Sequence, residues 1–412
     1  ELGIAASRMD LVFKYLVDNY AGAAPGDRAT ITAATQARDA FEALLPRLRA
    51  APVGWAAPAA LVLVLATPQL INFQGIVWKD VLFANLSVAA FVALAHAARD
   101  WDDRRSTLPP LAAACLCLAV ACLVRQNGAV AVAAFALAVG WIAGRRNWKW
   151  AVPWAVAAFA APMLLAAGLD AVNPVREPPG ARDLDAGVRI VQHYDLVGAL
   201  AADPTRPMPA LQASNPAGLA VLRKEAPKVY SPVRADTLSR SQSLGIALWR
   251  MDGKAIDEEW RNLILKDPVA YAEMRLSVFD WVFLTPKLDQ CLPIHVGVAG
   301  LPDQTVALGL VNGWEPPDAQ LYNYSTWWFD TPFYSHLTYG LLAFAVFVFL
   351  MIRRQAADIA VAGLMVAGLG FAATFAIISI ACDYRYCYFL DLAAITGVLY
   401  VALDPRLKPR AR

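Results

Sequence analysis

The sequence contains few charged residues. Only 17% of its 412 residues are Asp, Glu, Lys or Arg, whereas 58% are hydrophobic. Soluble globular domains carry about 25% charged residues, so this composition argues against a water-soluble globular protein. The formal net charge of +2 says little about partners, and the positions of the charges are more informative than their sum.

Several common functional motifs are also missing. The sequence has no metal-binding spacing of His and Cys, no glycine-rich phosphate loop, no Ser–His–Asp signature and no nucleic-acid-binding module. The N-terminus begins at Glu1 and lacks the order of basic start, apolar run and cleavage site that marks a signal peptide. We therefore expect no nucleic-acid partner and identify no cofactor.

The six cysteines fall into two groups. Three of them lie within an apolar run at residues 115–122, where a free cysteine packs as a small hydrophobic residue. Cys291, Cys382 and Cys387 lie outside the apolar runs or at the edge of one. A disulfide between Cys291 and either of the other two would suit an oxidising compartment, and the sequence does not choose between them.

The hydrophobic residues gather in blocks that are long enough to cross a membrane as helices. About 20 apolar residues span the hydrocarbon core of a bilayer, and the backbone there must be hydrogen-bonded within its own segment. No block shows the alternation of a barrel strand. The blocks are residues 53–73, 77–98, 108–124, 128–144, 150–170, 334–352, 357–380 and 385–403. The predicted fold class is an all-α integral membrane protein with about eight transmembrane helices.

The basic residues between these blocks lie on one side of the predicted membrane. Threading the helices alternately brings every basic connection to the same side, which the positive-inside rule predicts to be cytoplasmic. The connections contain Arg99, Arg104, Arg105, Arg145, Arg146, Lys149, Arg353, Arg354, Arg406, Lys408, Arg410 and Arg412. The sequence thus predicts a multi-pass protein of the bacterial inner (plasma) membrane.

The same threading divides the chain into five parts. They are an amphipathic cytoplasmic or membrane-surface segment (1–50), transmembrane helices 1–5 (51–170), an extracytoplasmic insert (171–333), transmembrane helices 6–8 (334–403) and a basic cytoplasmic tail (404–412). The insert, between the fifth and sixth helices, would be periplasmic or extracellular. We expect it to be mostly helical, because Asp257–Leu265 and Val269–Phe283 have helical patterns.

Three short polar motifs interrupt the apolar pattern at helix ends on the extracytoplasmic side. They are Trp78-Lys79-Asp80, Arg125-Gln126-Asn127 and Asp383-Tyr384-Arg385-Tyr386. Ionisable residues at membrane depth are costly and usually face the bundle interior or an aqueous cavity. Their cations Lys79, Arg125 and Arg385 also run against the positive-inside bias. We expect these three cations to bind one phosphate or pyrophosphate group.

The carboxylate and amides of these motifs have candidate roles and structural alternatives. Asp80 is a candidate catalytic base or substrate-orienting carboxylate, or else the counter-ion of Lys79 or Arg125. Gln126 and Asn127 can hydrogen-bond a sugar, and the alternative for them is capping of the next helix.

Asp383, Tyr384 and Tyr386 complete the predicted substrate-binding set. Either tyrosine can stack on a sugar or line a lipid groove, although tyrosines are also common at membrane interfaces. Asp383 can instead pair with Arg385. Of the histidines, His193 and His295 in the insert can each transfer protons, but a lone loop histidine is more often structural.

Three segments resemble motifs of bacterial polytopic glycosyltransferases of the GT-C type. They are Phe73–Ala84 (FQGIVWKDVLFA), the turn Arg125–Gly128, and Asp267–Tyr271 followed by Arg275. The segments are short but occur in the expected order. The resemblance implies an enzyme that transfers a sugar from a polyprenyl-phosphate carrier to a lipid, glycan or protein acceptor outside the cytoplasm.

The resemblance also implies how the residues would act. Lys79, Arg125 and Arg385 would hold the departing lipid phosphate, while a base activates the acceptor hydroxyl. Some members of that superfamily use a divalent cation, for which the sequence offers no ligand set. The catalytic carboxylate usually lies in the first extracytoplasmic loop, so we expect such a loop upstream of Glu1, or else Asp80 serves instead.

Functions of other classes stay open at this point. A transporter or flippase of a lipid-linked glycan would handle the same chemistry, as would a surface-polysaccharide polymerase or ligase. A non-catalytic remnant is a further alternative. The middle parts of the predicted helices carry almost no charge, which favours a one-sided site over alternating access.

Overall fold

The structure is a computed structural model that describes residues 56–76, 78–172, 184–285, 287–291 and 293–403. The predicted terminal segments, 1–50 and 404–412, lie outside the described residues. The chain divides into two compact units, Glu1–Leu61 and Val62–Arg412, and the fold described below is that of the second.

Every regular element in the described part of the chain is a helix, as predicted. The β-type contact there is an isolated antiparallel bridge between Val298 and Gly313. Among the described residues, seven helices are long and apolar enough to cross a membrane. They are α5 (Lys79–Arg99), α6 (Arg104–Val124), α7 (Ala129–Gly144), α8 (Ala151–Val172), α18 (His336–Arg353), α19 (Ala356–Ile378) and α20 (Tyr388–Ala402). Three of them follow a turn of 3-10 helix, namely η1 (Gln126–Gly128), η2 (Trp148–Trp150) and η5 (Tyr384–Cys387).

The first predicted block, residues 53–73, is not one straight helix. It forms α3 (Ala56–Leu65) and α4 (Pro68–Gln74), and the axes of this pair are bent by 70°. Helix α4 begins at a proline, which lacks the amide hydrogen needed to continue the preceding helix. Hydropathy does not detect such a bend. The bent pair is either a broken span or a re-entrant loop. The described part of the chain therefore has seven candidate spans, or eight if the pair counts as one span.

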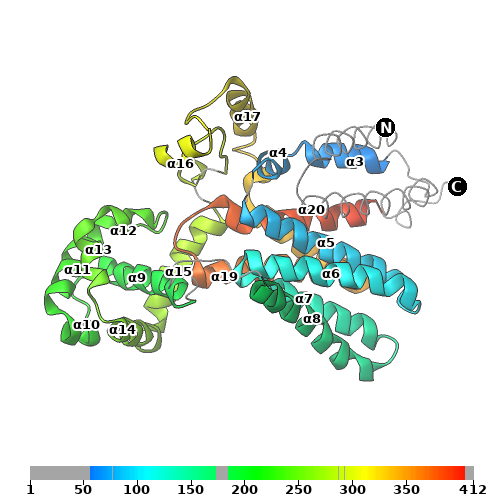
Figure 1. Ribbon diagram of the computed structural model, residues 1–412, viewed down its shortest axis with the longest axis horizontal. Helices are drawn as coiled ribbons and strands as arrows, with labels where there is room; N and C mark the ends of the chain where they lie inside the picture. The colour runs from blue at the N-terminus through cyan, green and yellow to red at the C-terminus, as the bar shows by residue number, and fades with distance from the viewer. Residues whose placement is uncertain (1–55, 77, 173–183, 286, 292, 404–412) are drawn as a thin grey trace, which may run out of the picture. The chain divides into compact units, whose positions relative to one another are not determined.

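The spans pack closely where their contacts are lined by small residues. Helix α5 packs against α6, α7 against α8, and α19 against both α5 and α7 (Figure 1). A Cβ atom added to Gly363 of α19 would lie 2.9 Å from the Cβ of Ala138, and one added to Gly140 of α7 would lie 2.7 Å from the Ala151 carbonyl oxygen. In lipid, van der Waals packing of this kind drives helix association.

The basic connections meet at one end of the bundle, which we call the basic end. Arg145 donates a hydrogen bond to the carbonyl oxygen of Arg354 at 2.7 Å, and Arg146 forms an ion pair with Asp102. The opposite end, where the chain leaves α8 and returns to α18, is called the insert end. These contacts confirm that connections far apart in the sequence lie together. The assignment of the basic end to the cytoplasm stays a prediction.

The segment between α8 and α18 is helical and has an apolar core of its own. Its elements are α9 (Leu184–Ala202), α10 (Pro209–Ser214), α11 (Pro216–Val229), α12 (Asp236–Arg240), α13 (Gln242–Trp249), α14 (Gly253–Lys266), α15 (Pro268–Phe283), η3 (Leu288–Gln290), α16 (Pro302–Ala307), α17 (Pro316–Thr326) and η4 (Pro332–Tyr334). Helices α9, α10, α11, α13 and α14, green in Figure 1, bury Leu196, Leu211, Leu222, Leu244 and Leu263 between them. The two helices predicted in this region correspond to α14 and α15.

A buried ion pair within the insert is also bonded to the bundle. Asp195 of α9 is fully buried and lies 2.8 Å from Arg275 of α15, which is 4% exposed. The Asp195 carboxylate also accepts hydrogen bonds from Trp260 at 2.9 Å and Tyr271 at 3.1 Å. Arg275 donates to the carbonyl oxygen of Ile377, near the end of α19. Tyr271 and Arg275, which belong to the third family-like segment, therefore connect three helices of the insert to a transmembrane helix.

Candidate functional site

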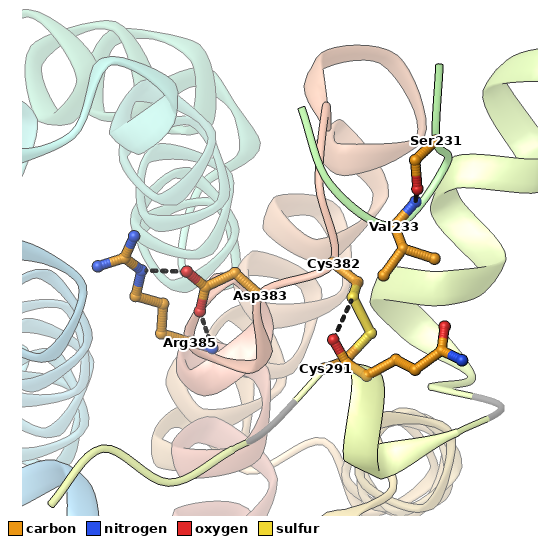
Figure 2. The surroundings of a disulfide bond; sticks show 7 residues. Ser231, Val233, Cys291, Cys382, Asp383 and Arg385 are labelled. Atoms are coloured by element: carbon orange, nitrogen blue, oxygen red, sulfur yellow. Dashed lines mark hydrogen bonds and ion pairs between the residues drawn. A yellow bond between two sulfur atoms is a disulfide. The ribbon is translucent and has the colours of Figure 1, made fainter. Parts of the chain in front are cut away.

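The three polar motifs come together at the insert end. Asp80, in the first turn of α5, forms an ion pair with Arg125, the residue that follows α6. Its Oδ2 atom lies 3.7 Å from Nε of Arg385 in η5, and the same Nε lies 2.8 Å from Oδ2 of Asp383. The Asp383–Arg385 pair is visible in Figure 2. We call these four residues the arginine–aspartate cluster.

Aromatic rings hold both guanidinium groups of the cluster. The Arg125 guanidinium lies 5.6 Å from the centre of the Phe375 ring and 5.8 Å from that of Tyr386. These two rings stack on each other with centroids 5.0 Å apart. The Arg385 guanidinium lies 4.7 Å from the centre of the Trp78 ring. Cation–π contacts and ion pairs together fix the guanidinium groups with little rotational freedom.

The cluster is balanced in charge but not completely hydrogen-bonded. Two carboxylates face two guanidinium groups, and Asp80 is only 4% exposed. Asp80 Oδ2 is nevertheless buried without a hydrogen-bond partner, because its distance to Arg385 Nε is 3.7 Å. Such atoms are rare in native proteins because each costs about 1–3 kcal/mol, and they often mark binding or catalytic sites.

Lys79 is not part of the cluster, and the predicted binding of one phosphate group by all three cations stays a prediction. Its side chain is exposed. The ion pairs of Asp80 go to Arg125 and Arg385 instead. The lysine begins α5, and the next residue points into the bundle, because successive residues of a helix face different directions. Of the alternatives considered for Asp80, the pairing with Arg125 is the one present.

The amides of the second motif take up positions beside the cluster. The Asn127 side chain donates a hydrogen bond to the hydroxyl oxygen of Thr374 in α19 at 2.9 Å. It does not cap the next helix as the alternative predicted, because Gly128 is the residue before α7 and no side chain caps that end. The Gln126 amide oxygen would lie 3.7 Å from a Cβ atom added to Gly187 of α9. Gln126 thus lies between the spans and the insert, whereas Asn127 is bonded to a span.

The two tyrosines of the third motif have different surroundings. Tyr386 borders the cluster through its stack on Phe375. Tyr384 is buried at 2% exposure, so it does not line an open sugar site as predicted. Its hydroxyl donates to Asp391 at 2.9 Å, and the other Asp391 oxygen lies 2.8 Å from Nδ1 of His336. Both partners of this second pair are completely buried.

The His336–Asp391 pair was not predicted from the sequence, because its two residues are 55 positions apart and form no local motif. A signal was nevertheless present. Asp391 is the one acidic residue in the block 385–403, and a carboxylate within an apolar block needs a polar partner.

A disulfide fastens the loop after α15 to the cluster. Cys291 pairs with Cys382, and their Cα atoms are 5.6 Å apart, a usual distance for a disulfide. Cys387, the other predicted partner, is buried and free. Figure 2 shows the disulfide beside Asp383 and Arg385. The structure therefore selects one of the two pairings that the sequence left open, and the chosen cysteine is the one next to the cluster.

Removal of this disulfide is expected to loosen the loop while the spans stay folded. A disulfide typically contributes about 2–4 kcal/mol by restricting the open chain. Cys382→Ser should therefore increase hydrogen exchange in residues 287–298 about tenfold or more, with little change in α5 or α19. Cys117→Ser, which removes a free thiol, is the matched control. Equal exchange in both variants would show that the disulfide does not hold the loop.

Metal ligation has no candidate in the part of the chain that the structure describes. No three or more His, Cys, Asp or Glu side chains gather there in a way that could hold a metal ion. The divalent cation considered from the sequence stays an untested prediction.

Comparison with known proteins gives no match. No family model, no curated protein and no solved structure matches the chain. Function is therefore argued from the chemistry of the site.

Proposed function

We propose that this protein is a membrane glycosyltransferase that takes a sugar from a polyprenyl-phosphate carrier. The acceptor would be a lipid, glycan or protein at the insert end, on the extracytoplasmic side. The observation that carries the proposal is the arginine–aspartate cluster, in which Arg125 and Arg385 from separate elements meet where the apolar spans end.

The charge of the substrate changes in the direction that this cluster favours. A polyprenyl-phosphate sugar is a phosphodiester with one negative charge, and the departing polyprenyl phosphate gains further negative charge as the sugar leaves. Fixed guanidinium groups stabilise that developing charge more than they stabilise the substrate, which is the condition for catalysis. Planar guanidinium groups also match two phosphate oxygens at once.

The four residues of the cluster suit different tasks. Arg385 is 31% exposed and can meet a phosphate directly, whereas Arg125 is 10% exposed and lies deeper. Asp80 holds both guanidinium groups in place, which we assign as its role in preference to that of the catalytic base. Asp383 holds Arg385 from the opposite side.

The depth of the cluster fits a lipid-linked substrate. Its residues lie at the ends of α5 and α6 and just before α20, where the apolar segments stop. The phosphate of a polyprenyl lipid lies at the same boundary between hydrocarbon and water. The prenyl chain would extend along the apolar surface of the spans, and the insert would cover the sugar.

A second candidate function is transport of a lipid-linked glycan. The buried His336–Asp391 pair favours it, because an ionisable pair inside a bundle is typical of ion or proton pathways. Tyr384 nevertheless links this pair to the insert end through the Asp391 oxygen. The pair is therefore near the same end as the cluster, which fits a one-sided site better.

Sugar transfer by the purified protein tests the proposal. The protein in lipid nanodiscs would be given radiolabelled polyprenyl-phosphate hexoses and pentoses together with bacterial lipid and glycan acceptors. We expect the label to move to an acceptor while free polyprenyl phosphate appears in equal amount. Heat-treated protein gives the background. Flux of the intact donor across proteoliposomes without transfer would reject the proposal in favour of transport.

A further inference from the structure

His295 lies at the exposed side of the arginine–aspartate cluster. It is exposed, and its ring packs edge-on against Trp78 with centroids 4.8 Å apart. The Arg385 guanidinium makes a cation–π contact with the same Trp78 ring. One indole therefore contacts both the imidazole and the more exposed cation of the cluster, so His295 is held beside the group proposed to meet the phosphate.

The loop that carries His295 is fixed by covalent and polar contacts. Four residues before it, Cys291 is bonded to Cys382, the neighbour of Asp383. The amide of Cys382 also donates to the carbonyl oxygen of Val233 at 2.8 Å. These bonds place a histidine from the insert next to a motif that lies almost ninety positions later in the chain.

The charged groups that act on His295 have opposite effects. Partial burial lowers the pKa of His295 below its usual value of 6.5, Asp383 raises it, and Arg385 lowers it. The net direction is downward, so the imidazole is neutral at pH 7 and one ring nitrogen has a lone pair for a proton. A protonated imidazole has no free lone pair and could not accept a proton.

Both carboxylates of the cluster face arginines, although burial raises the pKa of Asp383 above its usual value. Asp80 faces both arginines, and Asp383 accepts from the Arg385 backbone amide at 3.2 Å as well as facing its side chain. Within the described residues, the imidazole of His295 forms no ion pair with the cluster, whereas both carboxylates do.

We propose that His295 is the proton acceptor for sugar transfer, an inference that rests on the proposed function. The acceptor hydroxyl oxygen forms a bond to the anomeric carbon of the sugar while the bond from that carbon to the phosphate oxygen breaks. The electron pair of the broken bond leaves with the polyprenyl phosphate, beside Arg125 and Arg385. The hydroxyl proton passes to the free nitrogen of His295, so the products are a glycoside, polyprenyl phosphate and a protonated imidazole.

The test compares His295→Gln with the wild-type protein in the transfer assay. A general base contributes about 10²–10⁴-fold to rate, so transfer should fall by about 100-fold or more. Binding of the labelled donor should change by less than about threefold. The wild-type rate should fall as pH drops through the pKa of His295, because protonation removes the lone pair, whereas the variant should lose this acidic limb. Added imidazole should partly restore His295→Ala.

His193→Gln is the matched control. His193 is also a histidine of the insert, and burial lowers its pKa to about 4. The transfer rate of the His193→Gln variant should stay within about twofold of the wild-type rate. Wild-type rate and an unchanged pH profile in His295→Gln would overturn the inference and leave the proposed function standing. Parallel loss of donor binding and rate would also overturn it, since His295 would then only shape the site. Wild-type protein that neither binds nor transfers the donor would reject the proposed function itself.

Discussion

Replacing Arg275 with methionine is expected to destabilise the insert by about 3–5 kcal/mol, the usual cost of removing one partner of a buried ion pair. The guanidinium is 4% exposed and its partner Asp195 is completely buried, so the variant must either keep an unpaired carboxylate in the interior or protonate it. Burial already raises the pKa of Asp195 above its usual value, and loss of Arg275 removes the cation that lowers it. The donors on Trp260 and Tyr271 stay, but neither carries a charge. The measurement is hydrogen exchange of α9 and α14 in detergent-solubilised protein, where the free energy of local opening should fall by that amount.

Two further variants make this result specific. Lys228→Met breaks an ion pair with Glu225 in which the lysine is 57% exposed, and such pairs contribute less than about 1 kcal/mol. Combining Arg275→Met with Asp195→Leu should recover much of the lost stability, because no buried charge is then left alone. If Arg275→Met changed exchange no more than Lys228→Met, the buried pair would not stabilise the insert.

The Arg275–Asp195 pair shows that a sequence motif does not by itself identify the role of its residues. Arg275 follows a segment that resembles a family motif, and the resemblance assigned it no role. In the structure it bonds Asp195 and the carbonyl oxygen of Ile377, and so fixes the insert over the bundle. Its effect on any activity would come through the position of the insert.

The spans were predictable because their signal is local. Membrane thickness sets the block length, and seven of the eight predicted blocks overlap single helices, such as 128–144 with α7. The prediction of one helix for the first block was wrong because hydropathy measures side chains and ignores the backbone. There Pro68 starts a new helix. Helix α4 also buries Asn72, which donates to Ser325 and Tyr334 at 2.8 and 3.0 Å, and such polar pairing is invisible in a window average.

The candidate site was predictable only in part because it depends on tertiary contacts. The sequence placed Asp80, Arg125 and Arg385 on one side, and the structure brings them together. Lys79 is one residue from Asp80, yet it points outward, since rotation about the helix axis decides which of two neighbours faces inward. The position of His295 depends on a disulfide across 91 residues, and no local pattern determines such a pairing.

Replacing Arg385 with alanine should reduce sugar transfer by about 100-fold or more. Losing one partner of a close charge contact costs about 2–5 kcal/mol, and here the contact is strongest with the departing phosphate. Arg385→Lys keeps the charge but loses the planar pair of donors and the face-on contact with Trp78, so we expect only partial recovery. Initial rates of transfer and donor binding are both measured with the labelled polyprenyl-phosphate sugar. Together they separate an effect on the rate of transfer from an effect on donor binding.

Arg125 requires a compensated variant, because its removal would leave Asp80 buried and unpaired. Arg125→Gln combined with Asp80→Asn keeps size and hydrogen-bonding capacity while removing both charges, so the fold should survive and transfer should still fall strongly.

Lys79→Ala is the internal control. As an exposed cation outside the cluster, it should change the rate only a few-fold. Equal losses in Lys79→Ala and Arg385→Ala would mean that general positive charge at the insert end matters, and the defined cluster would no longer be the phosphate site. A large loss confined to Arg385 and the Arg125–Asp80 pair would locate phosphate recognition in the geometry of the cluster, because all these variants change charge on the same side of the bundle.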